Sequence, residues 1–378
     1  MRHGTPAQAG LDPAWTRRLV AEIRALPEGP TPCCAGVVAV AGRGPVVAVE
    51  EAAGWALRYG SYDVGRGRGV PLARERWEPV RAGTVFDLAS LSKLFTAIAV
   101  LQRVERGTLG LDDAVARHLP DFAPAVTIRH LLTHTSGLAA ELPLYDGAAG
   151  PGSDRLGPLW AAAAAAVPGP FCYSDLGFIA LQRLLETVEG ERLDVLVRDG
   201  ITGPLGMLST SYGPLAPAGV AATEAEVLLK ARRPSCTGGV VRGEVHDENA
   251  YALGGVAGQA GLFATAQDLA VLCRALLTGG GPVLRPETVA LMLAPPGLGF
   301  RVAQPGFMGE LAERGAAGHT GFTGTSLVLD PRTDTFFVLL TNAVHPRRGG
   351  EPVPRARLAT YLARATAARP PAGPSEAP

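Results

Sequence analysis

The chain lacks a long apolar run: none of its 378 residues lies in a segment approaching the roughly 18 apolar residues of a membrane-spanning helix. It also lacks an excess of either charge, since Lys and Arg number 35 and Asp and Glu number 35. This balance gives no indication of nucleic acid or an acidic membrane as a partner. Residues 1–6 lack the apolar core of a secretory signal, so we expect a cytoplasmic protein.

Cysteine is scarce and shows no pattern. The five cysteines are Cys33, Cys34, Cys172, Cys236 and Cys273. No two of them have the C-x-x-C spacing of zinc or redox motifs. We therefore expect scattered, reduced thiols rather than a disulfide framework.

Hydrophobic residues make up 47% of the chain, which is enough for one large core or two lobes around a cleft. Residues 37–40 and 46–49 predict one hairpin, and residues 325–329 and 335–340 predict another. Apolar residues recur at helical spacing over 11–26, 90–106, 178–188, 193–205, 266–277, 285–293 and 355–368. Strands at both ends with helices between them predict an α/β fold with one sheet and a helical insert.

We expect a single domain over residues 1–370 and a disordered tail over 371–378. Its sheet lobe would comprise about residues 10–85 and 245–368, and its helical lobe about residues 86–244. Within these lobes we expect exposed or irregular connections at 60–78, 139–158 and 211–242, the second lying over a site.

Ser90 and Lys93 stand three residues apart at the predicted start of a helix. This spacing puts both side chains on one helical face, so the Lys93 amine can reach the Ser90 hydroxyl and act on its proton. The apolar residues around them predict a partly desolvated lysine with a lowered pKa. By itself the pair is weak, because a capping serine and a solvated lysine have the same spacing.

Two further segments can serve such a serine. Tyr173, Ser174 and Asp175 follow a Pro-Gly-Pro break, where a tyrosine can reach into a cleft as a proton acceptor, or simply pack in the core with Asp175 as a helix cap. The segment Gly318 to Thr325 precedes the second hairpin, and its glycines suit either an edge strand that offers N–H groups to an oxyanion or a tight turn.

In this order, Ser-x-x-Lys, Tyr-x-Asp and His-Thr-Gly resemble the three motifs of the serine β-lactamase and penicillin-binding protein superfamily. The chain is most similar to its class C-type β-lactamase and esterase branch, over about residues 10–365. The resemblance extends to the flanks at 86–93, 128–138, 258–263 and 319–325. It implies a serine β-lactamase-like fold in which an antiparallel sheet flanked by helices meets a mostly helical lobe, with the active site in the cleft between them.

The resemblance also implies a role for each motif residue. Ser90 would be the acylated nucleophile, Lys93 its proton partner and Tyr173 the general base. Substrate would lie along Asp175, His319, Thr320, Gly321, Phe322 and Thr323. The oxyanion hole would combine the Ser90 N–H with that of Phe322 or Thr323.

The chain departs from the lactamase pattern at two of these positions. Asp175 replaces an asparagine and cannot donate a hydrogen bond while ionised, but can hold Lys93 charged. His319 replaces a lysine and lacks the permanent charge that attracts a β-lactam carboxylate. Both changes are common in esterase-like members, and both favour ester hydrolysis over antibiotic hydrolysis.

Other candidates are secondary. His246 and Asp247 resemble a further signature of this branch and could be site residues or could lock a loop. Gln259 stands where relatives frequently carry histidine. His130 and His134 have a metal-like spacing without a third ligand, so we expect no metal and no other cofactor.

We therefore predict a serine hydrolase that acts through a Ser90 acyl-enzyme on small esters. A β-lactamase, a peptidase or transpeptidase for D-amino-acid substrates, and a non-catalytic relative that binds acyl ligands are the alternatives. The predicted partner is a small ester, amide or lactam. Nothing in the sequence indicates an oligomeric state.

Overall fold

The computed structural model describes residues 1–146, 155–229 and 239–367. The strands are β1 Arg2–His3, β2 Gly36–Arg43, β3 Val46–Leu57, β4 Tyr59–Asp63, β5 Arg68–Pro71, β6 Glu78–Pro79, β7 Phe86–Asp87, β8 Ser211–Tyr212, β9 Leu262–Ala264, β10 Arg301–Val302, β11 Ala317–Thr320, β12 Ser326–Asp330 and β13 Thr335–Thr341. The α-helices are α1 Pro13–Ala25, α2 Ser92–Glu105, α3 Ile128–Leu132, α4 Gly157–Ala164, α5 Asp175–Glu189, α6 Leu193–Val197, α7 Gly203–Leu205, α8 Glu248–Ala252, α9 Ala266–Leu277, α10 Pro286–Leu293, α11 Pro305–Met308 and α12 Arg355–Ala367.

A central sheet joins the two ends of the chain. Its strand order is β1-β3-β2-β13-β12-β11-β10, with β6 pairing on β3. All of these pairs are antiparallel except β1 with β3. The pairing of β2 with β13 brings residues about 300 positions apart side by side, as the predicted single sheet requires.

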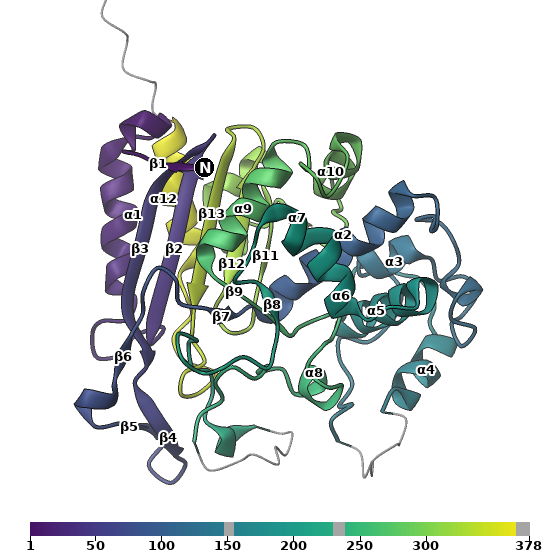
Figure 1. The fold of residues 1–378 in the computed structure, drawn as a ribbon, viewed down its shortest axis with the longest axis horizontal. Helices are drawn as coiled ribbons and strands as arrows, with labels where there is room; N and C mark the ends of the chain where they lie inside the picture. Colours follow the sequence, from purple (N-terminus) through teal and green to yellow (C-terminus); the bar gives the residue numbers. More distant parts are fainter. Residues whose placement is uncertain (147–154, 230–238, 368–378) are drawn as a thin grey trace, which may run out of the picture.

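Both faces of the sheet are covered, which explains why its strands are apolar on both sides. Along β2, Val37, Ala39 and Ala41 face the core under α1 and α12, because alternate side chains of a strand point to opposite faces. Val38 and Val40 face the larger core, which contains α2, α5 and α9. Figure 1 shows α1 and α12 on one side of the sheet and the helical part of the molecule on the other.

The predicted fold class is confirmed, together with both hairpins, while several local predictions are wrong. Residues 60–78 include the hairpin of β4 and β5 rather than only an irregular connection. The predicted helix over 193–205 is interrupted by a π-turn at Arg198–Thr202. Within 211–242, β8 pairs with β9. Residues 147–154, 230–238 and 368–378, which include the predicted tail, lie outside the described residues.

Helix α2 lies at the centre of the helical part. It is buried on all sides from Ser92 to Arg103, where only a narrower apolar face would be needed for a surface helix. The sequence places Ser90 inside this helix, but the structure places it in a separate 3-10 turn, Ala89–Leu91, directly before α2. In the described part of the chain, no helix is both long and apolar enough to cross a membrane.

Asn342, just after β13, joins the end of that strand to β2, β3 and a neighbouring loop by hydrogen bonds. Its Oδ1 accepts from the Gly36 N–H at 2.7 Å, and its Nδ2 donates to the Ala222 carbonyl at 3.2 Å and the Trp55 carbonyl at 3.3 Å. We expect Asn342→Ala to lower the free energy of unfolding by about 2–3 kcal/mol, because it leaves a buried N–H unpaired.

Urea unfolding measures this difference. Leu208, which is 94% exposed, offers a control, and Leu208→Ala should change the free energy of unfolding by less than about 0.5 kcal/mol. Equal free energies of unfolding for Asn342→Ala and the wild type would show that the hydrogen bonds of Asn342 do not stabilise the fold.

Candidate active site

The turn that carries Ser90 is held in a strained conformation. Ala89 has a φ of 47°, in the left-handed region that residues other than glycine rarely adopt. The buried carboxylate of Asp87 compensates by accepting from the Ala89 N–H at 2.8 Å and from the His246 N–H at 2.7 Å. The strain therefore persists because the surroundings fix the turn, which is typical of functional sites.

Lys93 lies in the first turn of α2 and is completely buried. Its Nζ donates to Ser90 Oγ at 2.9 Å and to the Gln259 carbonyl at 3.2 Å, and it forms an ion pair with Asp175 Oδ1 at 2.7 Å. The predicted contact with Ser90 is therefore present, and Asp175 lies beside the lysine as its counter-charge.

The predicted direction of the Lys93 pKa is wrong. Burial alone lowers the pKa of Lys93, but the negative charge of Asp175 and interaction with Tyr173 outweigh burial, so that the pKa lies above its ordinary value. The sequence reasoning included desolvation but not the size of the ion pair inside a low-dielectric site. The side chain is an ammonium group, which suits it for stabilising a neighbouring negative charge rather than for removing a proton.

Tyr173 precedes α5, whose N-cap is Ser174. The Ser174 hydroxyl accepts from the Gly177 N–H at 3.3 Å, so Ser174 rather than Asp175 caps the helix. The ring centroid of Tyr173 lies 5.0 Å from Lys93 Nζ and 4.6 Å from the ring centroid of His134. The tyrosine is thus packed beside the lysine at the site rather than in the core.

The end of β11 lies directly against the Ser90 turn. A Cβ atom on Gly321 would come within 2.4 Å of the Leu88 carbonyl oxygen and within 2.1 Å of Thr325 Oγ1, so only glycine permits this approach. Thr325 Oγ1 donates to the Leu88 carbonyl at 3.0 Å, and Thr323 Oγ1 donates to the Asp87 carbonyl at 2.8 Å. These bonds join the two segments.

Thr323 differs in position from the prediction, whereas His319 does not. Strand β10 pairs with β11 only at Ala317 and Gly318, so in the described part of the chain His319 and Thr320 have no strand beside them on that side, in agreement with the edge position considered for the glycine-rich segment. Burial, together with the charge of Lys93, lowers the pKa of His319 to about 3, so the imidazole is neutral. Thr323 is buried and does not line the cavity described next.

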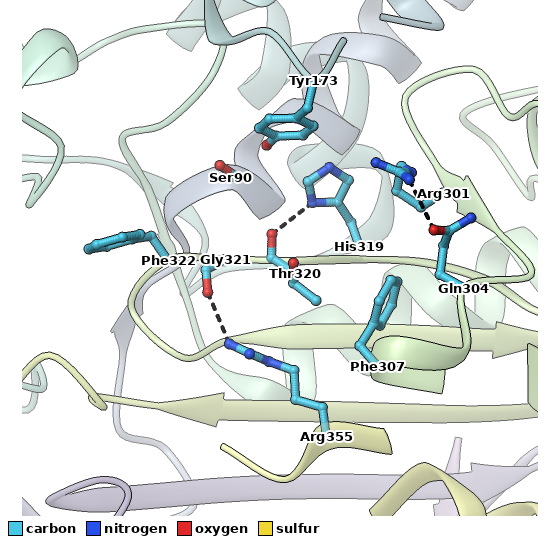
Figure 2. A pocket seen from close by; sticks show the side chains of 10 residues that line it. All are labelled: Ser90, Tyr173, Arg301, Gln304, Phe307, His319, Thr320, Gly321, Phe322 and Arg355. Carbon is cyan, nitrogen blue, oxygen red and sulfur yellow. Dashed lines mark hydrogen bonds between the residues drawn. The ribbon is translucent and has the colours of Figure 1, made fainter. Parts of the chain in front are cut away.

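The residues gather around a cavity of about 510 Å³ (Figure 2). The cavity is lined by Ser90, Tyr173, Arg301, Gln304, Phe307, His319, Thr320, Gly321, Phe322 and Arg355. Lys93, which is buried, and Asp175, which is partly exposed, are not among its lining residues. Among the residues that the structure describes, neither the Ser90 N–H nor the Phe322 N–H has a hydrogen-bond acceptor, so two backbone donors at this cavity are free.

Four lining residues were missed by the sequence reasoning. Arg301 stacks on the ring of Phe171 at 4.2 Å and donates to Gln304 Oε1 at 2.9 Å, and no carboxylate pairs with it within the described ranges. Arg355 donates to the Gly321 carbonyl at 3.1 Å. None of the four belongs to a motif, and only the pairing of β10 with β11 and the packing of α12 bring them here.

The secondary candidates have supporting positions. Asp247 caps α8 by accepting from the Ala250 N–H at 2.7 Å, and burial raises the pKa of Asp247 to about 6. His246 Nε2 lies 2.9 Å from Glu224 Oε2, and its ring stacks on Phe322. Gln259 Nε2 donates to Asp247 Oδ1 at 3.3 Å, while the Gln259 carbonyl binds Lys93. These three residues support the site and do not line its cavity.

The metal-like histidine pair has other partners. His130 Nδ1 accepts from the Thr127 N–H at 3.1 Å in a capping box, and His134 Nδ1 accepts from the Ser174 N–H at 3.0 Å. Within the described ranges, no three His, Cys, Asp or Glu side chains are grouped to hold a metal ion.

The chain is similar to known proteins over most of its length. A family model described as Beta-lactamase matches residues 28–362. A protein of Escherichia coli (strain K12) named "Putative D-alanyl-D-alanine carboxypeptidase" is 34% identical over 311 residues, covering 71% of each chain. A relative of the same name from Salmonella agona is 32% identical over 308 residues, 69% of this chain and 70% of its own.

Solved structures show the same fold. "EstCE1, a hydrolase with promiscuous acyltransferase activity" is 25% identical, with a TM-score of 0.65 over 93% of this chain and 98% of its own. The octameric penicillin-binding protein homologue from Pyrococcus abyssi is 20% identical, with a TM-score of 0.66 over 93% of this chain and 78% of its own. Simvastatin synthase from Aspergillus terreus is 21% identical, with a TM-score of 0.66 over 93% and 99%.

The buried histidines of the fold make its stability dependent on pH. Burial lowers the pKa of His134 to about 2, of His319 to about 3 and of His345 to about 4. In the unfolded chain a histidine has a pKa of about 6.5, so below that pH the unfolded chain binds more protons than the folded chain. The free energy of unfolding should therefore fall from about pH 6.5 to about pH 4, by about 1.4 kcal/mol per pH unit for each histidine. The pKa of Asp247 is raised in the folded chain, so its contribution to the pH dependence of the free energy of unfolding has the opposite sign. This contribution offsets that of about one histidine.

Urea unfolding at about pH 7 and about pH 5 measures this slope. His345→Gln should reduce the difference between the two pH values, whereas His3→Gln should not, because the His3 side chain is 70% exposed. A free energy of unfolding that is the same at both pH values would contradict the assignment of neutral, buried histidines.

Proposed function

The chain belongs to the Beta-lactamase family of serine hydrolases, and from this premise we propose that it hydrolyses small carboxylic esters through an acyl-enzyme on Ser90. One observation carries the proposal. A completely buried ammonium group, Lys93 Nζ, donates to Ser90 Oγ at 2.9 Å beneath a cavity that Ser90 itself lines. A serine hydroxyl needs a neighbouring base to attack a carbonyl carbon, and Tyr173, which packs beside this ammonium group, lines the same cavity.

In acylation, Tyr173 accepts the Ser90 hydroxyl proton as Oγ bonds to the substrate carbonyl carbon. Lys93 remains protonated, held by Asp175, and its positive charge balances the negative charge that the Tyr173 oxygen carries as a phenolate before it takes the proton. The carbonyl oxygen becomes an oxyanion and accepts from the free N–H groups of Ser90 and Phe322. Tyr173 then donates its proton to the alkoxide, which leaves as the alcohol.

Deacylation repeats these steps with water. Tyr173 accepts a proton from the attacking water, whose oxygen bonds to the acyl carbon. The second oxyanion is held by the same two N–H groups. Its collapse breaks the ester bond, and Ser90 Oγ regains a proton from Tyr173 as the carboxylic acid leaves.

A neutral ester suits the strand that lines the cavity. His319 occupies the position where the lactamase pattern has lysine, and its imidazole is buried and neutral. Its Nδ1–H donates to the Thr320 carbonyl at 2.8 Å, so Nε2 is the unprotonated nitrogen, and it is buried without a hydrogen-bond partner among the described residues. The position therefore presents no cation to a substrate carboxylate.

A second candidate is hydrolysis of peptides that end in D-amino acids, and Arg301 favours it. This guanidinium lines the cavity without a carboxylate partner among the described residues, so it can bind the carboxylate of such a peptide. The sequence argued against carboxylate substrates because His319 replaces a lysine, and Arg301 weakens that argument. The names of the Escherichia coli and Salmonella relatives agree with this candidate.

Loss of the nucleophile tests the main proposal. Ser90→Ala should lower kcat for p-nitrophenyl butyrate by about 10⁴-fold or more, because no other group can form the acyl-enzyme. A fluorophosphonate probe should label the wild type on the Ser90 peptide, detected by mass spectrometry, and should not label Ser90→Ala.

Ser211→Ala is the matched control, since Ser211 is exposed on β8 and should keep the wild-type rate and labelling. Wild-type hydrolysis by Ser90→Ala would overturn the proposal. Absence of labelling and of turnover in the wild type would favour a non-catalytic relative that binds acyl ligands.

Substrate comparison separates the two candidates. An esterase should hydrolyse p-nitrophenyl butyrate rapidly, with negligible turnover of a chromogenic cephalosporin or a D-alanyl-D-alanine peptide. If the peptide is instead the substrate, Arg301→Ala should lower kcat/KM for the peptide at least about tenfold more than for the ester, because a buried charge pair is lost. Equal effects on both substrates would exclude Arg301 as a carboxylate-binding residue.

A further inference from the structure

The two polar atoms of the peptide group between Gly321 and Phe322 differ in their hydrogen bonding. Its carbonyl oxygen accepts from Arg355 Nη2 at 3.1 Å and from the Gly324 N–H at 3.1 Å. Figure 2 shows the bond to Arg355. Its N–H, which belongs to Phe322, has no acceptor in the described part of the chain and lies at the cavity. One end of the group is therefore tightly held while the other end is free.

We propose that Arg355 is a positioning residue of the oxyanion hole, which orients and polarises the Phe322 N–H through the Gly321 carbonyl. This inference rests on the proposed function, since it assigns that N–H to the oxyanion of acyl transfer. Arg355 acts through the backbone and is not required to touch the substrate.

The planarity of the peptide bond makes this action possible. Because the C=O and N–H of one peptide group point in opposite directions in one plane, a bond that fixes the carbonyl also fixes the direction of the N–H. A charged donor makes a hydrogen bond about twice as strong as a neutral one. Electron density drawn toward the carbonyl oxygen also makes the N–H a stronger donor, because linked hydrogen bonds polarise one another.

The surroundings of Arg355 leave its charge available for this role. In the part of the chain that the structure describes, no carboxylate pairs with it, and its Nε is buried without a hydrogen-bond partner. The guanidinium is largely buried, and this burial lowers the pKa of Arg355. Among the described residues, the Arg355 side chain donates to the Gly321 carbonyl, so its charge is directed at this one peptide group.

Helix α12 orients the Arg355 side chain. Arg355 is the first residue of α12, and the helix packs on α1 and on α11 through the smaller core. Arg357 lies on the same turn but points elsewhere, since its guanidinium pairs with Glu22 of α1. The two arginines therefore form a matched pair on one helix, and only Arg355 lines the cavity.

The obvious competing role for Arg355 is direct binding of a substrate carboxylate. A neutral ester separates the roles, because p-nitrophenyl butyrate has no carboxylate to bind. A carboxylate-binding arginine would leave the kinetics of this ester unchanged, whereas a positioning arginine would not.

The experiment measures kcat and KM for p-nitrophenyl butyrate in the wild type, Arg355→Ala, Arg355→Met, Arg355→Lys and the control Arg357→Ala. We expect Arg355→Ala and Arg355→Met to lower kcat by about tenfold to 100-fold, with KM changed less than about threefold, because a weakened oxyanion donor acts mainly in the transition state. Arg355→Lys should recover part of the loss through its remaining charge, and added ethylguanidinium should raise the rate of Arg355→Ala. Arg357→Ala should match the wild type.

A spectroscopic readout distinguishes positioning from general damage. In the acyl-enzyme observed by stopped-flow infrared spectroscopy during turnover of p-nitrophenyl butyrate, the band of the ester carbonyl should lie at higher frequency in Arg355→Met than in the wild type, because the Phe322 N–H then polarises it less. Arg355→Met keeps most of the length of the side chain, so the test does not depend on Arg355→Ala folding.

Two results would overturn the inference. One is wild-type kcat on the neutral ester in Arg355→Met, and the other is an unchanged carbonyl band. Failure of the proposed function is a separate result, since it would appear in the wild type as absence of fluorophosphonate labelling and of ester turnover.

Discussion

The site depends on one energetic constraint, the complete burial of the Lys93 ammonium. An isolated charge in a protein interior is strongly disfavoured, so it persists only where opposite charge and hydrogen-bond acceptors surround it. Asp175 supplies the charge, and Ser90 Oγ and the Gln259 carbonyl supply acceptors. These groups come from α5, the Ser90 turn and the loop before β9, so satisfying one lysine brings three distant segments together.

A second constraint is the contact between the Ser90 turn and the end of β11. Gly321 has no side chain, and this allows the strand to lie against Leu88. Thr323 and Thr325 donate to carbonyls of the segment before Ser90, while Asp87 holds the strained backbone at Ala89. The same contact leaves the Ser90 and Phe322 N–H groups free at one cavity, so packing and proposed chemistry have a common origin. His246, Asp247 and Gln259 support the same contact. The His246 N–H donates to Asp87, Gln259 donates to Asp247, and the Gln259 carbonyl accepts from Lys93.

Much of this was predictable because the information is local. The i, i+3 spacing of Ser90 and Lys93 puts them within reach in any helical turn, and runs of β-branched residues on either side of turn residues predict the hairpins. The order of the three motifs predicted Tyr173 and His319 at the same site, and both line the cavity. The position of Ser90 in a 3-10 turn was not predictable from apolar periodicity, because the turn is imposed by the Asp87 carboxylate and the contact with β11.

The sequence by itself determined the fold class, the sheet built from both ends of the chain, and the identity of the motif residues, because periodicity and motif order are properties of neighbouring positions. Only the tertiary structure decided the sign of the Lys93 pKa, since burial and the Asp175 charge oppose each other and their balance depends on a distance. It also decided that Arg301 and Arg355 line the cavity. Arginines are frequent in this chain and carry no local signal of their own. Their places follow from the pairing of β10 with β11 and the packing of α12, which join residues far apart in sequence.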